Sequence, residues 1–340
     1  MTKHRDSRYN TGMKLYIPNS AFLGNIDPFL KSFDPCFPEF LEITANDKWI
    51  SVHPIVLSMI AALGLTVEPK NIRCQKLEAK FSHYLARMGL FKTLQIPFET
   101  SFVEPEPAGR FIPITRIRNS DELSTFITDM IPLLHLEPEP ARTVGYIVGE
   151  LVRNVLEHSE SRDGALLCAQ YFKKSNAIRV GIADTGVGIR QTITRSHPAQ
   201  TDLEAIRLAL WPGITGATSR EGGTEQNAGA GLFFVKSIAS ANRDFFVIYS
   251  GEALYKLLKK PTGSRVRLNA DPLKDRHSRE EDFPYWRGTV VGADITLDQT
   301  AAFSALLDAI AGTYKAAVRA QKPHAAFSPH PLPSSSRHRS

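Results

Sequence analysis

The chain has 340 residues, enough for two domains with a sizeable core, and its 42% hydrophobic and 22% charged residues are ordinary for a globular protein. Its net charge of +6 comes from the two ends, because residues 1–14 carry +3 and residues 315–340 carry +5, which leaves −2 for residues 15–314. This distribution is not that of a folded nucleic-acid-binding groove, and we expect no specific nucleic-acid partner.

Membrane insertion and disulfide bonding are also not expected. The longest apolar run, near residues 55–65, is too short to span a bilayer, and the polar start "MTKHRDSRYN" is unlike a signal peptide. Three cysteines, Cys36, Cys74 and Cys168, lie far apart and have no metal-binding spacing. These features predict a cytoplasmic protein with reduced cysteines.

The first region of the chain, residues 15–95, is predicted to form a small α/β domain. "FLEIT" and "KNIRCQKL" are typical of strands, and "SVHPIVLSMIAALGL" predicts a helix that Ser51 opens, with Pro54 in its first turn. A second helix, "AKFSHYLARMG", should end at Gly89. The prolines that follow predict a linker over residues 96–118.

The second region, residues 119–298, has the element order of an α+β sandwich. Two helices come first, then two strands separated by a turn, then two further helices, and then more strands, so the chain does not alternate strand and helix. The helices are expected over 119–135, 139–158, 202–211 and 231–241, and the strands in "ALLCAQYFKK", "AIRVGIADTG", "DFFVIYS", "SRVRLNA" and "GTVVGADITL".

The C-terminal region should contain one helix and a disordered tail. Over residues 299–320, one helix face carries Phe303, Leu306, Leu307, Ile310 and Tyr314. This face either covers the sheet, which we favour, or pairs with a second copy to make a homodimer. Residues 321–340 are rich in Pro, Ser and His, and their composition predicts disorder.

A polar stripe interrupts the second of these predicted helices. Glu150, Asn154 and His158 follow each other at intervals of four residues, so they share one face of an otherwise apolar helix. Such a stripe is either a solvated edge or part of a site, and taken alone the solvated edge is the commoner outcome.

Two glycine motifs follow this helix. In "ADTGVGI", Asp184 ends a strand and can accept a hydrogen bond from an exocyclic amine, while Gly186 and Gly188 allow close approach of a ligand. In "NAGAGLFF", Gly229 and Gly231 begin a helix whose free amides suit a phosphate. Each motif alone is weak, since the first is also an ordinary turn and the second could also begin a Rossmann motif, although Phe234 replaces the third glycine of that motif. No P-loop motif is present.

The order and spacing of these motifs resemble those of the GHKL ATPases, which include histidine kinases, gyrase, MutL, ninety-kilodalton heat-shock chaperones and anti-sigma serine kinases. The resemblance covers residues 140–298 and includes Gly288-Thr289, which is similar to the last box of the histidine kinases. It implies an α/β sandwich in which helices cover a mixed sheet, and a site for ATP with Mg²⁺.

The resemblance also implies a role for each motif residue. Asn154 would bind Mg²⁺, and Glu150 would orient or deprotonate the attacking water or hydroxyl. Asp184 would recognise the adenine amino group in a pocket shaped by Gly186 and Gly188. Residues 190–228 would form an ATP lid. The backbone amides presented to the phosphates would come from Gly229, Gly231 and Leu232.

The N-terminal region more weakly resembles STAS-like modules, in "ITANDKWISVHPIVLSMIAALG" and "YLARMGLF", and the alternative is a generic α/β domain. The resemblance implies a STAS-like or other signalling protein as partner. A phosphoacceptor histidine of the "HExxxP" kind is absent, because His135 lies just before two prolines.

We therefore expect a bacterial-type cytoplasmic regulatory protein that hydrolyses ATP or transfers its phosphoryl group to a Ser, Thr or His of a partner. The alternative is a non-catalytic interaction protein in which nucleotide only gates partner binding. The intact Glu150 favours catalysis.

Overall fold

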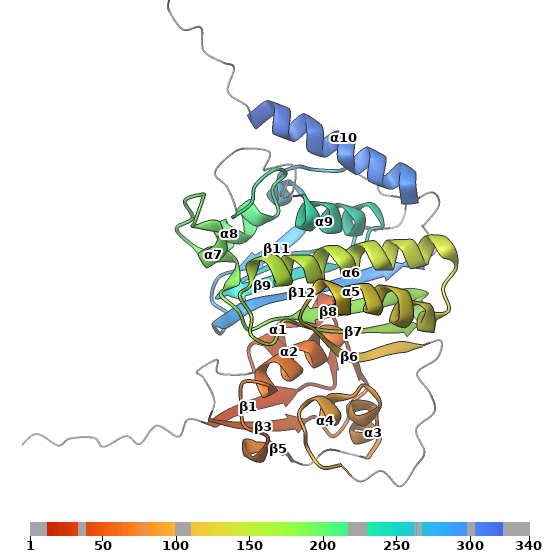
Figure 1. Cartoon of the computed structure of the whole chain (residues 1–340), viewed down its shortest axis with the longest axis vertical. Helices are drawn as coiled ribbons and strands as arrows, with labels where there is room; N and C mark the ends of the chain where they lie inside the picture. The colour runs from red at the N-terminus through yellow and green to blue at the C-terminus, as the bar shows by residue number, and fades with distance from the viewer. Residues whose placement is uncertain are drawn as a thin grey trace, which may run out of the picture.

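The computed structural model describes residues 12–32, 39–75, 77, 79–98, 110–216, 230–261, 263, 267–297 and 303–321. A large sheet covered by helices occupies one part of the molecule, and a small α/β unit lies on the other side of this sheet (Figure 1). The α+β class predicted from the sequence is confirmed. Within the described residues, no helix has both the length and the apolar character that crossing a bilayer requires.

The large sheet has seven strands in the order β11-β10-β9-β12-β8-β7-β6, and every neighbouring pair is antiparallel. The predicted mixed sheet is therefore wrong. Short turns join β7 to β8 and β9 to β10, and such turns allow only antiparallel pairing. The strands are β6 (Phe111–Ile117), β7 (Ala165–Phe172), β8 (Ala177–Ala183), β9 (Phe246–Gly251), β10 (Ala253–Leu257), β11 (His277–Glu280) and β12 (Trp286–Thr296).

Both faces of this sheet are buried, which explains why its central strands are apolar without interruption. Along β7, Leu166 and Cys168 join the core shared with the small unit, whereas Leu167 and Ala169 join the core under the helices. When both faces are covered, the usual alternation of apolar and polar residues disappears. The predicted strand in "SRVRLNA" is not found in its described part, residues 267–270, and β10 and β11 take its place at the sheet edge.

Helices cover one face of the sheet in two layers. The long helix α6 lies along the strands, and α10 packs on α6 and α9 and not on the sheet itself (Figure 1). The C-terminal apolar face is thus covered within the chain, but by helices. The elements are α5 (Ser120–Thr125) with its continuations η3 (Phe126–Met130) and η4 (Ile131–Leu134), α6 (Pro138–His158), α7 (Gly188–Ile193), α8 (Asp202–Ala209), α9 (Gly231–Ala241) and α10 (Phe303–Gln321).

The small unit is built on a parallel three-stranded sheet in the order β1-β3-β5. The sequence predicts that Ser51 opens the main helix of this unit, but Ser51 lies in a strand. His53 caps the helix instead, because its Nδ1 accepts the Ile55 amide hydrogen at 3.0 Å. The elements are β1 (Gly12–Ile17), β2 (Ser20–Ala21), η1 (Leu23–Asn25), α1 (Asp27–Leu30), β3 (Phe40–Ala45), β4 (Ser51–Val52), α2 (Pro54–Gly64), η2 (Pro69–Asn71), β5 (Ile72–Cys74), α3 (Ala79–Arg87) and α4 (Leu90–Thr93).

Helix α2 joins the small unit to the large sheet, because all of its residues are buried and it packs against β7, β8 and β12. A side chain at Gly181 in β8 would place its Cβ 2.1 Å from the Ile55 amide nitrogen, so only glycine fits under the helix. Ser58 donates a hydrogen bond to the Gly181 carbonyl oxygen at 2.8 Å. The sequence predicts two domains, residues 15–95 and 119–298. In the structure, residues of both ranges contribute to one shared core.

The predicted linker over residues 96–118 differs from the structure as well. Residues 111–117 form β6, which pairs with β7 at the edge of the sheet, and Phe111 and Ile114 are buried. Edge strands tolerate proline, and Pro113 lies at an irregularity in the pairing between Ile112 and Thr115. Residues 99–109 lie outside the described residues, and so does the predicted tail over 321–340 except for Gln321, which is the last residue of α10.

A buried polar cluster connects the start of α2 to the sheet. The His53 Nε2 lies 3.2 Å from Asp294 Oδ1, and Arg179 Nε lies 3.4 Å from the same oxygen. The Arg179 guanidinium lies over the rings of Phe22 and Phe172, 4.3 and 4.1 Å from their centroids. Because the His53 Nδ1 accepts a hydrogen bond, the proton of the neutral ring is on Nε2, facing Asp294.

Replacing Gly181 with Ala tests the contact between α2 and β8. The added methyl group would overlap the backbone of Ile55, so we expect the free energy of unfolding to fall by about 3 kcal/mol or more. A matched control is Gly312→Ala in α10, where a Cβ meets nothing within 4 Å, and this change should be neutral or stabilise by about 0.5–1 kcal/mol. Urea denaturation measures both, and equal stability of the two variants would contradict the contact.

His53 should make stability depend on pH. Burial lowers the pKa of His53 in the folded protein, so the neutral ring stabilises the fold above the unfolded-state pKa, and this contribution is lost as the pH falls. Protonation would also remove the Nδ1 acceptor that caps α2. We expect the parent to lose stability from pH 7.5 to pH 5 more steeply than His53→Asn, by on the order of 1 kcal/mol. Parallel slopes in denaturation experiments would contradict this role.

Candidate functional site

A cavity of about 290 Å³ lies on the helical face of the sheet, between α6, the end of β8, α7 and the start of α9. It brings together six of the residues predicted from the sequence. Gly186 lies outside the lining, and Gly229 lies outside the described residues. The predicted residues that line the cavity are Glu150, Asn154, Asp184, Gly188, Gly231 and Leu232, and His158 lines it as well.

The most unusual group in this cavity is the carboxyl of Asp184, which is only 1% exposed. Its Oδ1 accepts a hydrogen bond from the Gly186 amide at 2.8 Å, but its Oδ2 has no hydrogen-bond partner among the described residues. Burial raises the pKa of Asp184 to about 7, although hydrogen bonds from the backbone of Gly186 and Thr289 oppose the rise. An unpartnered buried carboxyl oxygen is costly, so a group that donates to it would relieve a real penalty.

The chain around Asp184 is held by close backbone contacts. Strand β12 has a pairing irregularity between Trp286 and Val290, where Gly288 has a φ of +103° and passes so close to Asp184 that a Cβ would lie 2.3 Å from its carbonyl oxygen. The Trp286 Nε1 donates to the same carbonyl at 3.0 Å. Gly186 presses against α6, since its Cβ would lie 2.0 Å from the Ser159 carbonyl oxygen. Gly186 therefore shapes the loop from behind the cavity.

The polar stripe on α6 forms the opposite end of the cavity. Asn154 donates from Nδ2 to the Glu150 backbone carbonyl at 2.7 Å, which makes Oδ1 the end of the amide that can bind a cation. The Glu150 carboxylate pairs with Arg153, and burial raises the Glu150 pKa while the Arg153 charge opposes the rise. A Cβ at Gly231 would lie 2.6 Å from Glu150 Oε2, so the start of α9 touches the stripe.

Sequence reasoning missed two residues of this site. Arg153 lines the cavity, and its only sequence signal is its position three residues after Glu150, which is the spacing of a helical ion pair. Trp286 is buried and fixes the Asp184 carbonyl, and its signal is only its position two residues before Gly288. Neither residue belongs to the motifs that the sequence singles out.

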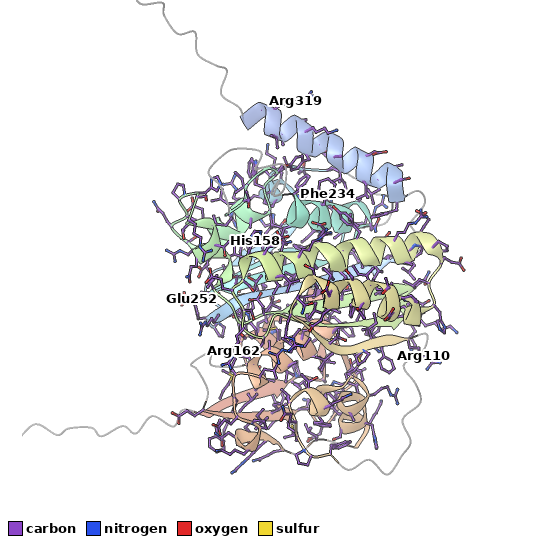
Figure 2. The ribbon with its side chains drawn as sticks, in the orientation of Figure 1. Arg110, His158, Arg162, Phe234, Glu252 and Arg319 are labelled. Carbon is purple, nitrogen blue, oxygen red and sulfur yellow. The ribbon has the colours of Figure 1, made fainter. Side chains whose placement is uncertain are left out.

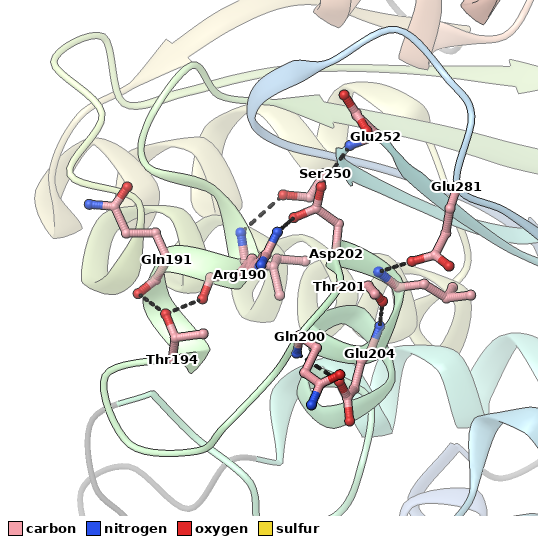
Figure 3. A network of polar contacts seen from close by, with 12 residues as sticks. Arg190, Gln191, Thr194, Gln200, Thr201, Asp202, Glu204, Ser250, Glu252 and Glu281 are labelled. Atoms are coloured by element: carbon pink, nitrogen blue, oxygen red, sulfur yellow. Dashed lines mark hydrogen bonds and ion pairs between the residues drawn. The ribbon is translucent and has the colours of Figure 1, made fainter.

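The predicted lid over residues 190–228 is packed in its first half. Figure 3 shows a contact that holds this segment to the sheet: the Asp202 carboxylate accepts the Glu252 amide hydrogen at 3.0 Å. Directly before the segment, the Ile189 amide donates to the Ser250 hydroxyl at 3.0 Å. Ala205, Ile206 and Leu210 lie in the core, because α8 has an apolar face. Residues 217–228 of the predicted lid lie outside the described residues.

An aromatic cluster supports the two helices that carry the site. Phe234 lies on α9 where it faces α10 (Figure 2), and its ring centroid is 6.1 Å from that of Tyr314 on α10 and 6.3 Å from that of Tyr146 on α6. Tyr146 in turn lies 5.9 Å from Phe303 on α10. Since Tyr146 is one turn before Glu150, α10 fixes the distance between α6 and the start of α9.

The donor set of the cavity restricts the cation it could hold. Among the residues that the structure describes, no group of three or more His, Cys, Asp or Glu side chains is arranged as a metal site. A transition-metal centre built from protein ligands is not indicated in this part of the chain. The amide oxygen of Asn154 suits a hard cation that takes its other ligands from phosphate and water.

The cavity lining combines polar groups with apolar side chains, and Leu151, Val155, Ile189 and Ile193 are among the apolar ones. Such an arrangement fits a flat, partly apolar ligand with a hydrogen-bond donor at one end and an anionic group at the other. No protein-family model matches the chain, and no curated protein sequence matches it. The site is therefore interpreted from its own geometry and from the motifs.

Replacing Asp184 with Asn tests whether the buried carboxyl destabilises the ligand-free protein. Above pH 7 the parent keeps a buried, ionised carboxyl, whereas Asn is neutral and can still accept the Gly186 hydrogen bond. We expect Asn to stabilise the ligand-free protein by about 1 kcal/mol or more at pH 8, and the gain to vanish near pH 5, where the folded-state carboxyl is protonated. A loss of stability at pH 8 in urea denaturation would show that the carboxyl is structural.

Proposed function

We propose that the protein binds ATP together with Mg²⁺ in this cavity, as a GHKL-type ATPase domain does. The observation that carries the proposal is the unpartnered Asp184 Oδ2 at the buried end, because an exocyclic amine such as that of adenine would donate to it. Support comes also from the other end, where Asn154 and the glycine start of α9 lie together. The motif order along the chain agrees with this arrangement of base and phosphates.

The residues present fit the magnesium ion that this proposal requires. The Asn154 Nδ2 is occupied by the helix backbone, so its Oδ1 would hold the ion, with phosphate oxygens and water completing the coordination. When bound, Mg²⁺ would supply charge neutralisation of the phosphates. The backbone amides at the start of α9 would bind a phosphate oxygen, and Gly231 allows the approach because it has no side chain.

Glu150 is the residue that would act on the nucleophile. Its Oε2 lies toward Gly231 and so toward the phosphate end, and burial raises its pKa in the direction that suits a general base. The Glu150 carboxylate would take the proton from a water or from a hydroxyl of a partner protein. The oxygen of that nucleophile then bonds to the terminal phosphorus, the bond to the bridging oxygen breaks, and ADP leaves.

Two substitutions on α6 should separate binding from chemistry. Asn154→Ala removes a magnesium contact, so the Mg²⁺-dependent affinity for ATP should fall by about tenfold or more. Glu150→Ala leaves the binding groups in place, so ATP should bind at least about as well as to the parent, while any turnover falls by about a hundredfold or more.

Calorimetric titration and phosphate release on each variant measure the two effects. Asp184→Asn should weaken ATP binding as well, because the amide offers a donor where an acceptor is needed. If the folded Asn154 and Asp184 variants bind ATP like the parent, or if the parent does not bind ATP, the proposal is wrong.

A further inference from the structure

We propose that Arg153 makes this site prefer ATP over ADP, by releasing Glu150 and pairing with the terminal phosphate when ATP binds. The inference rests on the proposed ATP site and adds the residue that senses its third phosphate. Its basis is the position of Arg153 at the open end of the cavity, where it is held by contacts that a phosphate can replace.

The Arg153 guanidinium lies flat along α6 at the rim of the cavity. Its Nη2 pairs with Glu150 Oε1, and its Nε donates to the Gly149 carbonyl oxygen at 3.2 Å. The Arg153 side chain is 53% exposed and that of Glu150 is 21% exposed, so both can be reached from solvent.

The cavity has one closed and one open end, which fixes the direction of a bound nucleotide. Asp184, the proposed adenine partner, is 1% exposed, so the base would enter first and the phosphates would extend toward Arg153. Among the described residues that line the cavity, Arg153 alone is a Lys or Arg. His158 also lines it, but burial lowers the His158 pKa and favours the neutral ring.

The charges at the open end require a change of partner. The terminal phosphate of ATP would lie beside the Glu150 carboxylate, because the Oε2 of Glu150 faces the start of α9. Two neighbouring anions repel each other. Arg153 is half-exposed, so water screens its ion pair with Glu150 and leaving that pair costs Arg153 little, whereas guanidinium and phosphate form strong paired hydrogen bonds. ADP lacks the terminal phosphate, so with ADP bound Arg153 stays on Glu150.

The test measures the affinities for ADP and for a non-hydrolysable ATP analogue, both with Mg²⁺, on the parent, Arg153→Gln and Arg153→Lys. Arg153→Gln should lose about tenfold or more in affinity for the ATP analogue and less than about threefold for ADP, and Arg153→Lys should keep part of the preference. Arg142→Gln is a matched control, because Arg142 pairs with Glu139 at the same three-residue spacing on α6, away from the cavity. It should bind both nucleotides like the parent.

Thermal unfolding confirms that each variant is folded before its affinities are compared. Equal losses for ADP and the ATP analogue would assign Arg153 a general structural or electrostatic role, and unchanged affinities would assign it none; either result overturns the inference but leaves the ATP site standing. A parent that binds neither nucleotide overturns the site and the inference together. A preference for the ATP analogue that is lost only in the Arg153 variants supports both.

Discussion

The contact between the first turn of α2 and strand β8 is the constraint on which the rest of the structure depends. It requires the absence of a side chain at Gly181, because the Ile55 backbone occupies the place of a Cβ. With α2 seated there, the sheet is covered on one face by the small unit and on the other by α6 and α9. A sheet packed on both sides is stiff, and the strand ends that carry polar groups are held in place.

Strand β8 links this packing to the candidate site. Asp184 follows Gly181 by three residues and comes directly after the end of β8. Its buried carboxyl has an unpartnered oxygen. A buried carboxyl of this kind persists only where the surrounding backbone is overdetermined, and here Trp286 and Gly288 fix it from β12. The free energy that stabilises the sheet therefore also maintains a local arrangement that is unfavourable in itself.

Local patterns predicted much of the fold and six of the residues that line the candidate cavity, and long-range pairing explains what they missed. Helix α9 begins at Gly231 as predicted, and the stripe on α6 and Asp184 were identified because spacing and glycines are local signals. The all-antiparallel order could not be deduced, since it depends on which distant strands meet. Helix α2 is apolar all round, which predicts burial but not its neighbours. The His53 cap was missed because histidine is not a preferred capping residue.

The shared core has a consequence for any shortened form of this protein. A fragment that begins at β6 would expose to water the side chains of the sheet that share a core with the small unit, among them Leu166, Cys168, Val247 and Val290. They lie on β7, β12 and β9, and Ala183 of β8 lies between β7 and β12, so together they would form one contiguous apolar patch. Such a surface promotes self-association, so the isolated helical half would precipitate even if all its hydrogen bonds formed.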